Sequence, residues 1–308
     1  MSQIAWPVVH DNRSRGKGPI VKKQLVVLCL AVALAAGCGS DSKPAASTAS
    51  SSSTAPKLSK IISLSPTATE MLFAIGAGSQ VIAVDDQSNF PANAPKTDLS
   101  GNTPNVEAIA GKQPDLVVLA NDTAGVVAGL KNVGIESLVL PAATTLDDTY
   151  AQLSKLGEVT GHTGEATAVV TKMKSDVDSL VKQIPKTSST KTYYYELDNT
   201  FFTATSKTFI GAVIALTGLT NIGDAADDGS GYPQLSQEKI VAANPDFIFL
   251  ADTKCCAQSK DTVSQRPGWD TISAVKTGKI VSLDDDIASR WGPRVVDLLR
   301  EIVEAVKA

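Results

Sequence analysis

One pattern occurs twice in this chain and constrains its fold more than any other feature. Residues 107–120 read EAIAGKQPDLVVLA and residues 238–251 read EKIVAANPDFIFLA, with six identical positions. Each copy is typical of a short helix, a Pro-Asp turn and a buried strand. Convergence on a common helix-turn-strand unit would explain the Pro-Asp pair and the aliphatic residues. It does not explain why Glu107 and Glu238 begin both helices, although acids favour helix N-termini.

Short β-rich runs alternate with helical patterns from Lys60 onward, which favours parallel sheets covered by helices. Thr67 and Glu70 have the spacing of a capping box, and Pro66 suits a helix start. The predicted strands of the first half are 61–64, 81–84, 116–119 and 136–140, and its helices are 67–75, 106–110 and 124–133. In the second half we expect elements at 192–197, 209–217, 238–243, 247–251, 269–275, 280–283 and 295–306.

Two consecutive helical patterns, 147–159 and 163–183, separate the halves. The second contains no Gly or Pro from Glu165 to Ile184 and stops at Pro185. The predicted fold is therefore α/β, with two three-layer lobes joined by one long α-helix. We place the N-terminal lobe at 58–161, the bridging helix at 162–186 and the C-terminal lobe at 187–308.

The N-terminus has the pattern of an export signal. Lys22 and Lys23 precede the apolar run 25–36, which is too short to span a bilayer and has the length of a signal-peptide core. The run ends in Leu-Ala-Ala-Gly-Cys38, which resembles a bacterial lipobox, although Ala35 replaces the usual larger aliphatic residue. The resemblance implies cleavage after residue 37 and a lipid on Cys38; the alternative is an ordinary signal peptide. Residues 1–20 lie outside this pattern, and Val21 is a candidate start.

Residues 38–57 are rich in Ser, Ala and Thr and lack apolar periodicity, which is typical of a flexible linker. A lipidated cysteine followed by such a linker predicts a protein anchored on the extracytoplasmic face of the cell membrane. We expect this protein to be a monomer. Removing residues 1–37 leaves 23 basic against 31 acidic residues. This acidic balance argues against nucleic-acid binding.

Catalytic and metal-binding constellations are missing from the sequence. Only His10 and His162 are present, so a histidine-based triad or an imidazole metal site is not expected, and no phosphate-binding loop occurs. We expect His162 to be a surface or capping residue. The acidic run 284–286 is expected to be a solvated turn, with a hard-cation site as the alternative. The sequence predicts neither an enzyme nor a cofactor.

Cys255 and Cys256 are adjacent and follow a predicted strand. In an oxidising compartment their only intramolecular partner would be each other, so we expect a vicinal disulfide, with two free thiols as the alternative. Loops at the carboxyl ends of parallel strands face the ligand crevice, so the pair would stiffen a crevice loop.

Aromatic residues are scarce, and several stand in predicted loops beside Pro or Gly. Such residues contact large, partly apolar ligands, although peripheral packing is the alternative for each. The aromatic ligand-binding candidates are Phe90, Phe202, Tyr232, Trp269 and Trp291.

Several motifs together resemble the solute-binding proteins of ABC importers for iron-siderophore complexes and vitamin B12. They include IISLSPTATEMLFAIG at 61–76, SNFP at 88–91, NVEAI at 105–109, QPDL at 113–116 and YPQLS at 232–236. The opening and the YPQLS segment are closest to the vitamin B12 branch. The resemblance implies two lobes bridged by a helix, little hinge motion, and a ligand between the lobes.

The resemblance also implies residue roles. Glu107 and Glu238 match glutamates that dock onto arginines of the permease, Phe90 matches a cleft aromatic of the N-terminal lobe, and Phe202 and Tyr232 match those of the C-terminal lobe. Gly101 stands where the vitamin B12 binder has a further tryptophan.

Two arginines complete the predicted site. Arg290 and Arg294 fall near the cleft-side loop of the last lobe, where they would meet carboxylates or hydroxamates of a ligand. A salt bridge at a helix start is the alternative for Arg294.

The sequence therefore predicts a lipoprotein that delivers a corrinoid or ferric-siderophore chelate to an ABC permease. A haem receptor is an alternative, because Tyr193, Tyr194, Tyr195 and Tyr232 offer phenolic ligands. An exported α/β enzyme or an adhesion module is the alternative outside the transport class.

Overall fold

The computed structural model describes residues 58–185 and 190–307, which belong to one compact unit spanning 56–308. The predicted signal peptide, the predicted lipidation site Cys38 and the predicted linker lie outside the described residues. Among the helices that are described, none is long and apolar enough to cross a membrane.

The first lobe is built on five parallel strands in the order β3-β2-β1-β4-β5. The strands β1 (Ile61–Leu64) and β4 (Leu116–Leu119) are buried along their whole length, as expected for strands covered on both faces. Both were predicted from the sequence with these bounds. The others are β2 (Val81–Asp85), β3 (Lys96–Leu99), which the sequence did not reveal, and β5 (Glu136–Val139).

Helix α1 (Pro66–Ala74) begins differently from the prediction. Ser65 is its N-cap, and the Ser65 side chain accepts a hydrogen bond from the Ala68 backbone N–H. The predicted capping box of Thr67 and Glu70 is wrong, because the Glu70 side chain is buried and bonds elsewhere. The lobe also contains α2 (Val106–Ala110) and α3 (Val126–Asn132).

The second lobe has four parallel strands in the order β7-β6-β8-β9. The strands are β6 (Thr192–Glu196), β7 (Thr220–Asn221), β8 (Phe247–Leu250) and β9 (Ile280–Ser282). Its helices are α6 (Phe209–Ala215), α7 (Gln237–Ala243), α8 (Lys260–Ser264), α9 (Ser273–Lys276), α10 (Asp285–Ala288) and α11 (Val295–Lys307). The predicted element 269–275 is a short 3-10 turn followed by α9.

The repeated segments occupy equivalent places in the two sheets. Strand β4 pairs with β1, and β8 pairs with β6. In each sheet this partner is the strand that comes first along the chain. The aspartate of each Pro-Asp pair fastens its strand to that partner: Asp115 Oδ2 accepts from the Lys60 backbone N–H, and Asp246 Oδ2 from that of Thr192, both at 2.9 Å. The repeat therefore encodes one structural unit used twice.

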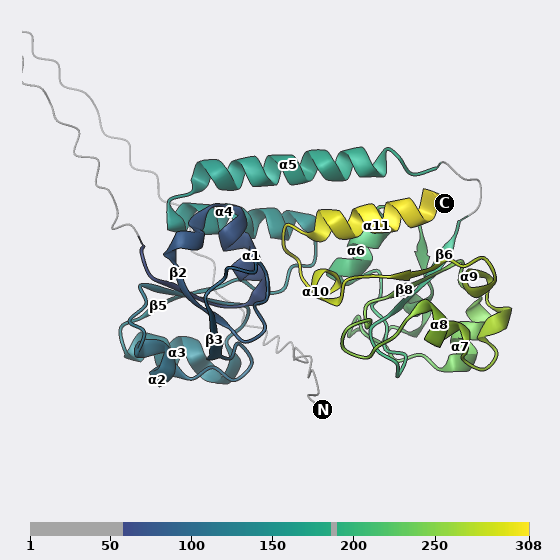
Figure 1. Ribbon diagram of the computed structural model, residues 1–308, viewed down its shortest axis with the longest axis horizontal. Helices are drawn as coiled ribbons and strands as arrows, with labels where there is room; N and C mark the ends of the chain where they lie inside the picture. The colour runs from purple at the N-terminus through teal and green to yellow at the C-terminus, as the bar shows by residue number, and fades with distance from the viewer. Residues whose placement is uncertain (1–57, 186–189, 308) are drawn as a thin grey trace, which may run out of the picture. The chain divides into compact units, whose positions relative to one another are not determined.

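Two antiparallel helices follow the first sheet. Helix α4 (Leu146–Thr160) ends at Gly161, whose φ of 77° suits a glycine, and α5 (Thr163–Val181) then leads toward the second lobe (Figure 1). Gly157 allows the close approach of the two helices, because a Cβ at this position would lie 2.5 Å from the Cβ of Ala166.

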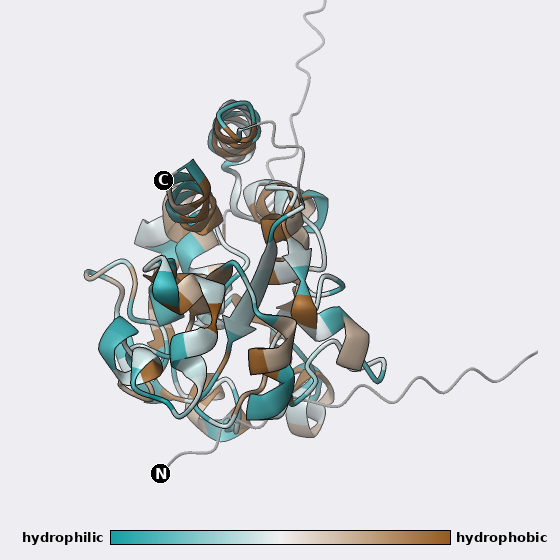
Figure 2. Cartoon of the chain, turned by 90° about the vertical axis from the view of Figure 1, so that its right-hand side faces the viewer, coloured by the Kyte–Doolittle hydropathy of each residue, from teal (hydrophilic) through white to brown (hydrophobic). Residues whose placement is uncertain are grey.

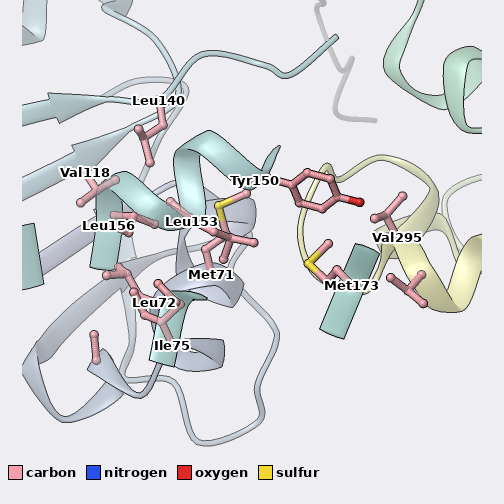
Figure 3. Close-up of a cluster of buried hydrophobic side chains, with 14 of the residues drawn as sticks. Met71, Leu72, Ile75, Val118, Leu140, Tyr150, Leu153, Leu156, Met173 and Val295 are labelled. Atoms are coloured by element: carbon pink, nitrogen blue, oxygen red, sulfur yellow. The ribbon is translucent and has the colours of Figure 1, made fainter. Parts of the chain in front are cut away.

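A single hydrophobic cluster connects the two lobes. It runs from Met71 and Leu72 on α1 through Leu153 on α4 and Met173 on α5 to Val295 on α11 (Figure 3). Figure 2 looks along α5 and α11 and shows hydrophilic residues in teal beside hydrophobic residues in brown on both helices. The lobes are thus joined by continuous packing as well as by the chain, which favours a stable mutual orientation.

Candidate functional site

Residues 290–294, which connect α10 to α11, lie against the first lobe. The Trp291 indole N–H donates to Gln152 Oε1 at 2.9 Å, and the Thr149 hydroxyl donates to the Trp291 carbonyl at 2.9 Å. Arg290 Nη2 donates to the Gln87 carbonyl at 3.1 Å. We call residues 290–294 the crossing segment, because they tie the end of the second lobe to α4 and to the loop after β2.

A buried carboxylate lies at the centre of this contact. Glu70, on α1, is 4% exposed and accepts hydrogen bonds from Arg290 Nη1 at 2.8 Å and from Arg294 Nε at 2.9 Å. Arg294 Nη2 donates to the same carboxylate. A buried charge is tolerated when it is paired and hydrogen-bonded, and two guanidinium groups satisfy this condition here.

In the structure the two arginines bond to protein groups, whereas the sequence predicted that they contact a ligand. Arg290 is 9% exposed, and its guanidinium is committed to Glu70, to the Gln87 carbonyl and to Asp286 at 3.2 Å. Its predicted role as a ligand-binding residue stays a prediction, although these bonds already occupy its guanidinium. Arg294 forms the salt bridge at a helix start that the sequence left as the alternative, and its partner Glu70 could not be found from the local sequence.

Phe90 is one of the large hydrophobic residues that remain exposed, with 43% of its surface accessible. It lies in the loop after β2, and its peptide bond to Pro91 is cis. The guanidinium carbon of Arg294 lies 4.2 Å from the centre of the Phe90 ring. A cavity of about 260 Å³ adjoins this pair and is lined by Glu70, Phe73, Ala74, Phe90, Pro91, Pro293 and Arg294.

Phe202 and Tyr232 are brought together in the second lobe. Phe202 is 38% exposed and lies in the loop after β6, where it pairs with Gln234 in an isolated antiparallel bridge. Tyr232 is half-buried against the cluster that contains Tyr193 and Phe249. Burial raises the pKa of the Tyr232 hydroxyl. An exposed aromatic side chain is therefore available in each lobe.

The prediction that Trp269 lines a cleft is wrong. Its side chain is fully buried, 6.2 Å between ring centres from Tyr194 and stacked on Phe201 at 6.1 Å. Trp291 belongs to the crossing segment and is half-buried against the core, with its indole N–H bonded to Gln152. Of the five aromatic candidates, Phe90 and Phe202 are exposed, Tyr232 and Trp291 are half-buried, and Trp269 is buried.

Gly101 has no space for any side chain. A Cβ there would lie 2.5 Å from the Leu64 carbonyl oxygen and 2.9 Å from Asp85 Oδ2. The backbone at this point packs against the end of β1, so the aromatic residue of the resembled branch has no counterpart. Burial raises the pKa of the neighbouring Asp85 to about 6.

The tyrosines considered as haem ligands are mostly core residues. Tyr193, Tyr194 and Tyr195 are all buried on β6. The Tyr195 hydroxyl donates to the Ala288 carbonyl, and the Tyr193 hydroxyl accepts from Asn221. His162 lies at the turn between α4 and α5 with Nδ1 3.0 Å from the Thr160 carbonyl oxygen. Tyr232 alone among the named tyrosines retains accessible surface.

The acidic run 284–286 is a structural junction rather than a solvated turn. Asp284 is the N-cap of α10. Asp285 accepts hydrogen bonds from the backbone N–H groups of Thr253, Lys254 and Cys255 at 2.8, 2.8 and 2.9 Å. Asp286 accepts from Asn89 of the first lobe at 3.0 Å. No group of three or more His, Cys, Asp or Glu side chains within 58–185 and 190–307 is arranged to hold a metal ion.

Cys255 and Cys256 are free thiols in the structure, which is the alternative that the sequence left open. Their loop follows β8, as predicted, but it is held by the hydrogen bonds to Asp285 rather than by a sulfur bridge. Burial, followed by the hydrogen bond with Cys256, raises the pKa of the Cys255 thiol well above its usual value. The Cys255 thiol is thus poorly ionised at neutral pH.

A buried ionic cluster was not found from the sequence. Arg266 Nη1 donates to Glu196 Oε2 at 2.6 Å, and the Arg266 guanidinium lies 4.6 Å from the Trp269 ring centre. Asp252 is fully buried beside them. Its own burial and then the negative charge of Glu196 raise the pKa of Asp252 to about 8. No local signal distinguishes these residues from ordinary strand-end charges.

Glu107 and Glu238 are both exposed and stand in the first turns of α2 and α7. These helices lie on the side of the described unit away from α5 (Figure 1). Each helix is capped by a polar residue that precedes it: Asn105 accepts from the Ala108 N–H at 3.0 Å, and Ser236 from the Lys239 N–H at 3.3 Å.

The pKa of Glu238 is lowered by hydrogen bonds from the Glu238 backbone N–H and from the Ser236 side chain. Within the described residues no salt bridge neutralises either carboxylate.

Known proteins share both the sequence and the fold. The chain is 30% identical over 257 residues to an uncharacterized ABC transporter substrate-binding lipoprotein of Bacillus subtilis, covering 80% of this chain and 79% of that protein. It is 29% identical over 254 residues to a cobalamin-binding protein of Halobacterium salinarum, covering 80% and 69% respectively.

A solved structure is similar as well. It is that of a possible iron-binding, periplasmic solute-binding protein from Staphylococcus epidermidis, with a TM-score of 0.71, 26% identity, and coverage of 82% of this chain and 100% of that one. Residues 61–287 match the family described as periplasmic binding protein, and the chain, with its two parallel α/β lobes, belongs to that family.

Proposed function

We propose that this protein is the lipid-anchored, extracytoplasmic binding component of an ABC importer and that it delivers a corrinoid to the permease. Family membership and the Bacillus relative, which is named a substrate-binding lipoprotein, support the transport role. The lipobox-like segment ending at Cys38 supports the anchor. The observation on which the ligand proposal rests is the pair of exposed aromatic residues, Phe90 and Phe202, one from each lobe.

The ligand is held mainly by apolar contact. Phe90, Phe202 and Tyr232 offer ring surface from both lobes, and a corrinoid presents a broad, partly apolar face with peripheral amides. Aromatic rings bury much surface at a small entropic cost, so few polar contacts are needed to orient such a ligand. The Halobacterium relative, named a cobalamin-binding protein, supports the corrinoid class.

Docking to the permease depends on Glu107 and Glu238. Both carboxylates are exposed in the first turns of equivalent helices, one in each lobe. Complementary arginines on the permease would attract them, and such peripheral charges govern the rate and register of docking more than its strength.

A ferric siderophore is the second candidate ligand. The similar staphylococcal structure is named as possibly iron-binding, which supports it. Haem is less favoured, because three of the four tyrosines considered as its ligands are buried in the second sheet: Tyr193, Tyr194 and Tyr195.

The test is calorimetric titration of the exported protein, purified in detergent, with cyanocobalamin, a ferric hydroxamate siderophore and haemin. We expect saturable 1:1 binding of cyanocobalamin. Phe90→Ala and Phe202→Ala should each weaken it about tenfold or more, because burying an aromatic side chain is worth about 1.5–3 kcal/mol. Val133→Ala, at an exposed hydrophobic residue near the end of α3, is the matched control.

Two results would change this assignment. Binding of the ferric siderophore without binding of cyanocobalamin would transfer the proposal to the second ligand class. Absence of binding to all three chelates would refute it.

A further inference from the structure

Arg294 has a geometry that separates it from an ordinary salt-bridge residue. Its Nε and Nη2 atoms both donate to the Glu70 carboxylate, which fixes the plane of the guanidinium. The guanidinium carbon lies over the Phe90 ring, 4.2 Å from the ring centre. A planar cation held along its edge in this way is an ordered platform for an aromatic ring.

The platform and the ring belong to different lobes. Phe90 follows β2 in the first lobe, whereas Arg294 lies in the crossing segment that follows α10. Arg290, from the same segment, donates to Glu70 at 2.8 Å and to the Gln87 carbonyl at 3.1 Å, three residues before Phe90. The orientation of the Phe90 ring is therefore set by the contact between the crossing segment and the first lobe.

An exposed phenylalanine in a loop would otherwise sample several rotamers, and a ligand that contacts it would have to order it. With one side against Arg294, the ring is already ordered while 43% of its surface stays accessible. Preorganisation of one such side chain changes affinity by roughly three- to tenfold.

We propose that Arg294 is a positioning residue, which presents Phe90 to the bound chelate and does not itself contact the chelate. The inference rests on the proposed function, in that Phe90 is taken as a ligand contact. Arg294 therefore affects ligand affinity indirectly, through the contact between the crossing segment and the first lobe.

The test is a double-mutant cycle with cyanocobalamin as the probe. Arg294→Met should weaken binding three- to tenfold in the parent protein and cause no further loss in the Phe90→Ala background. Arg294→Lys, which keeps the cation but cannot bond along its edge, should restore affinity only in part. Arg300→Met is the control, because Arg300 lies on α11, is exposed and pairs with Asp297. An equal loss in both backgrounds would overturn the inference.

A second measurement does not depend on ligand binding. The protein is labelled with 4-fluorophenylalanine, and the fluorine resonance of Phe90 is assigned by its disappearance in Phe90→Ala. Arg294→Met should shift and broaden this resonance in the ligand-free protein, whereas Arg300→Met should leave it unchanged. An unchanged Phe90 resonance in Arg294→Met would overturn the positioning role even if no chelate binds. Absence of chelate binding combined with a shifted resonance would refute the proposed function and leave the Arg294–Phe90 relationship supported.

Discussion

Glu70 and Arg290 are 220 residues apart in the sequence, and their side chains meet at 2.8 Å in a buried ion pair. This contact, together with the second arginine at 294, fastens the C-terminal part of the chain to α1. Both lobes therefore contribute to one charged junction, and its removal should affect the whole compact unit.

Replacing Glu70 with Ala should destabilise the protein by about 3–5 kcal/mol, because two guanidinium groups would lose their buried counter-charge. The measurement is equilibrium unfolding in urea, followed by circular dichroism. Glu158→Ala removes an exposed pair with Lys155 and should change the stability by less than about 1 kcal/mol. Equal stabilities for the two variants would contradict a structural role for the Glu70 junction.

Charge reversal at the docking helices should separate binding from transport. A variant carrying both Glu107→Lys and Glu238→Lys should bind cyanocobalamin with unchanged affinity and should fail to support its uptake by cells. The reason is that permease arginines would meet cations instead of carboxylates. Glu158→Lys, on the exposed surface of α4, is the control for general charge effects. Unimpaired uptake by the double variant would disprove the docking role.

The buried Asp252 should make stability depend on pH. Its pKa is raised to about 8 in the folded protein, against an ordinary value of 3.8 when unfolded. Between these values the folded state retains a proton that the unfolded state has lost, so this group's contribution to stability falls as the pH rises from about 4 to about 8.

Asp252→Asn should remove this dependence, because an amide stays neutral at both ends of the range. The free energy of unfolding, measured in urea at pH 6 and pH 9, should fall less between the two conditions in Asp252→Asn than in the parent. Asp270→Asn, at an exposed position, should behave like the parent. A decrease in Asp252→Asn as large as that in the parent would show that another group is responsible.

The Cys255 thiol should remain reduced and react slowly. The raised pKa of the Cys255 thiol leaves little thiolate at neutral pH, and the thiolate is the reactive form. A thiol count on unreduced, denatured protein should therefore give two free groups. Alkylation of Cys255 in the native protein at pH 7, followed by peptide mass spectrometry, should be slower than that of a free cysteine peptide. A count of zero would show that the pair is oxidised to the disulfide after all.

The sequence determined the parts of this protein that depend on local chemistry. The repeated pattern, 107–120 and 238–251, was sufficient to predict two equivalent helix-turn-strand units, because periodicity and turn residues act over a few positions. The bounds of β1, β4 and α2 were predicted for the same reason.

The tertiary structure decided which of several similar residues became accessible. Phe90 and Trp269 were both predicted from the sequence to be loop aromatics. In the structure α8 and β6 bring partners that bury Trp269, while 43% of the Phe90 surface stays accessible. Glu70 was predicted to be a capping residue, but in the folded protein it pairs with Arg290 and Arg294, which are distant in the sequence. The burial and the ion pairing of a residue depend on neighbours that are distant in the chain, and no local sequence pattern specifies which residues these are.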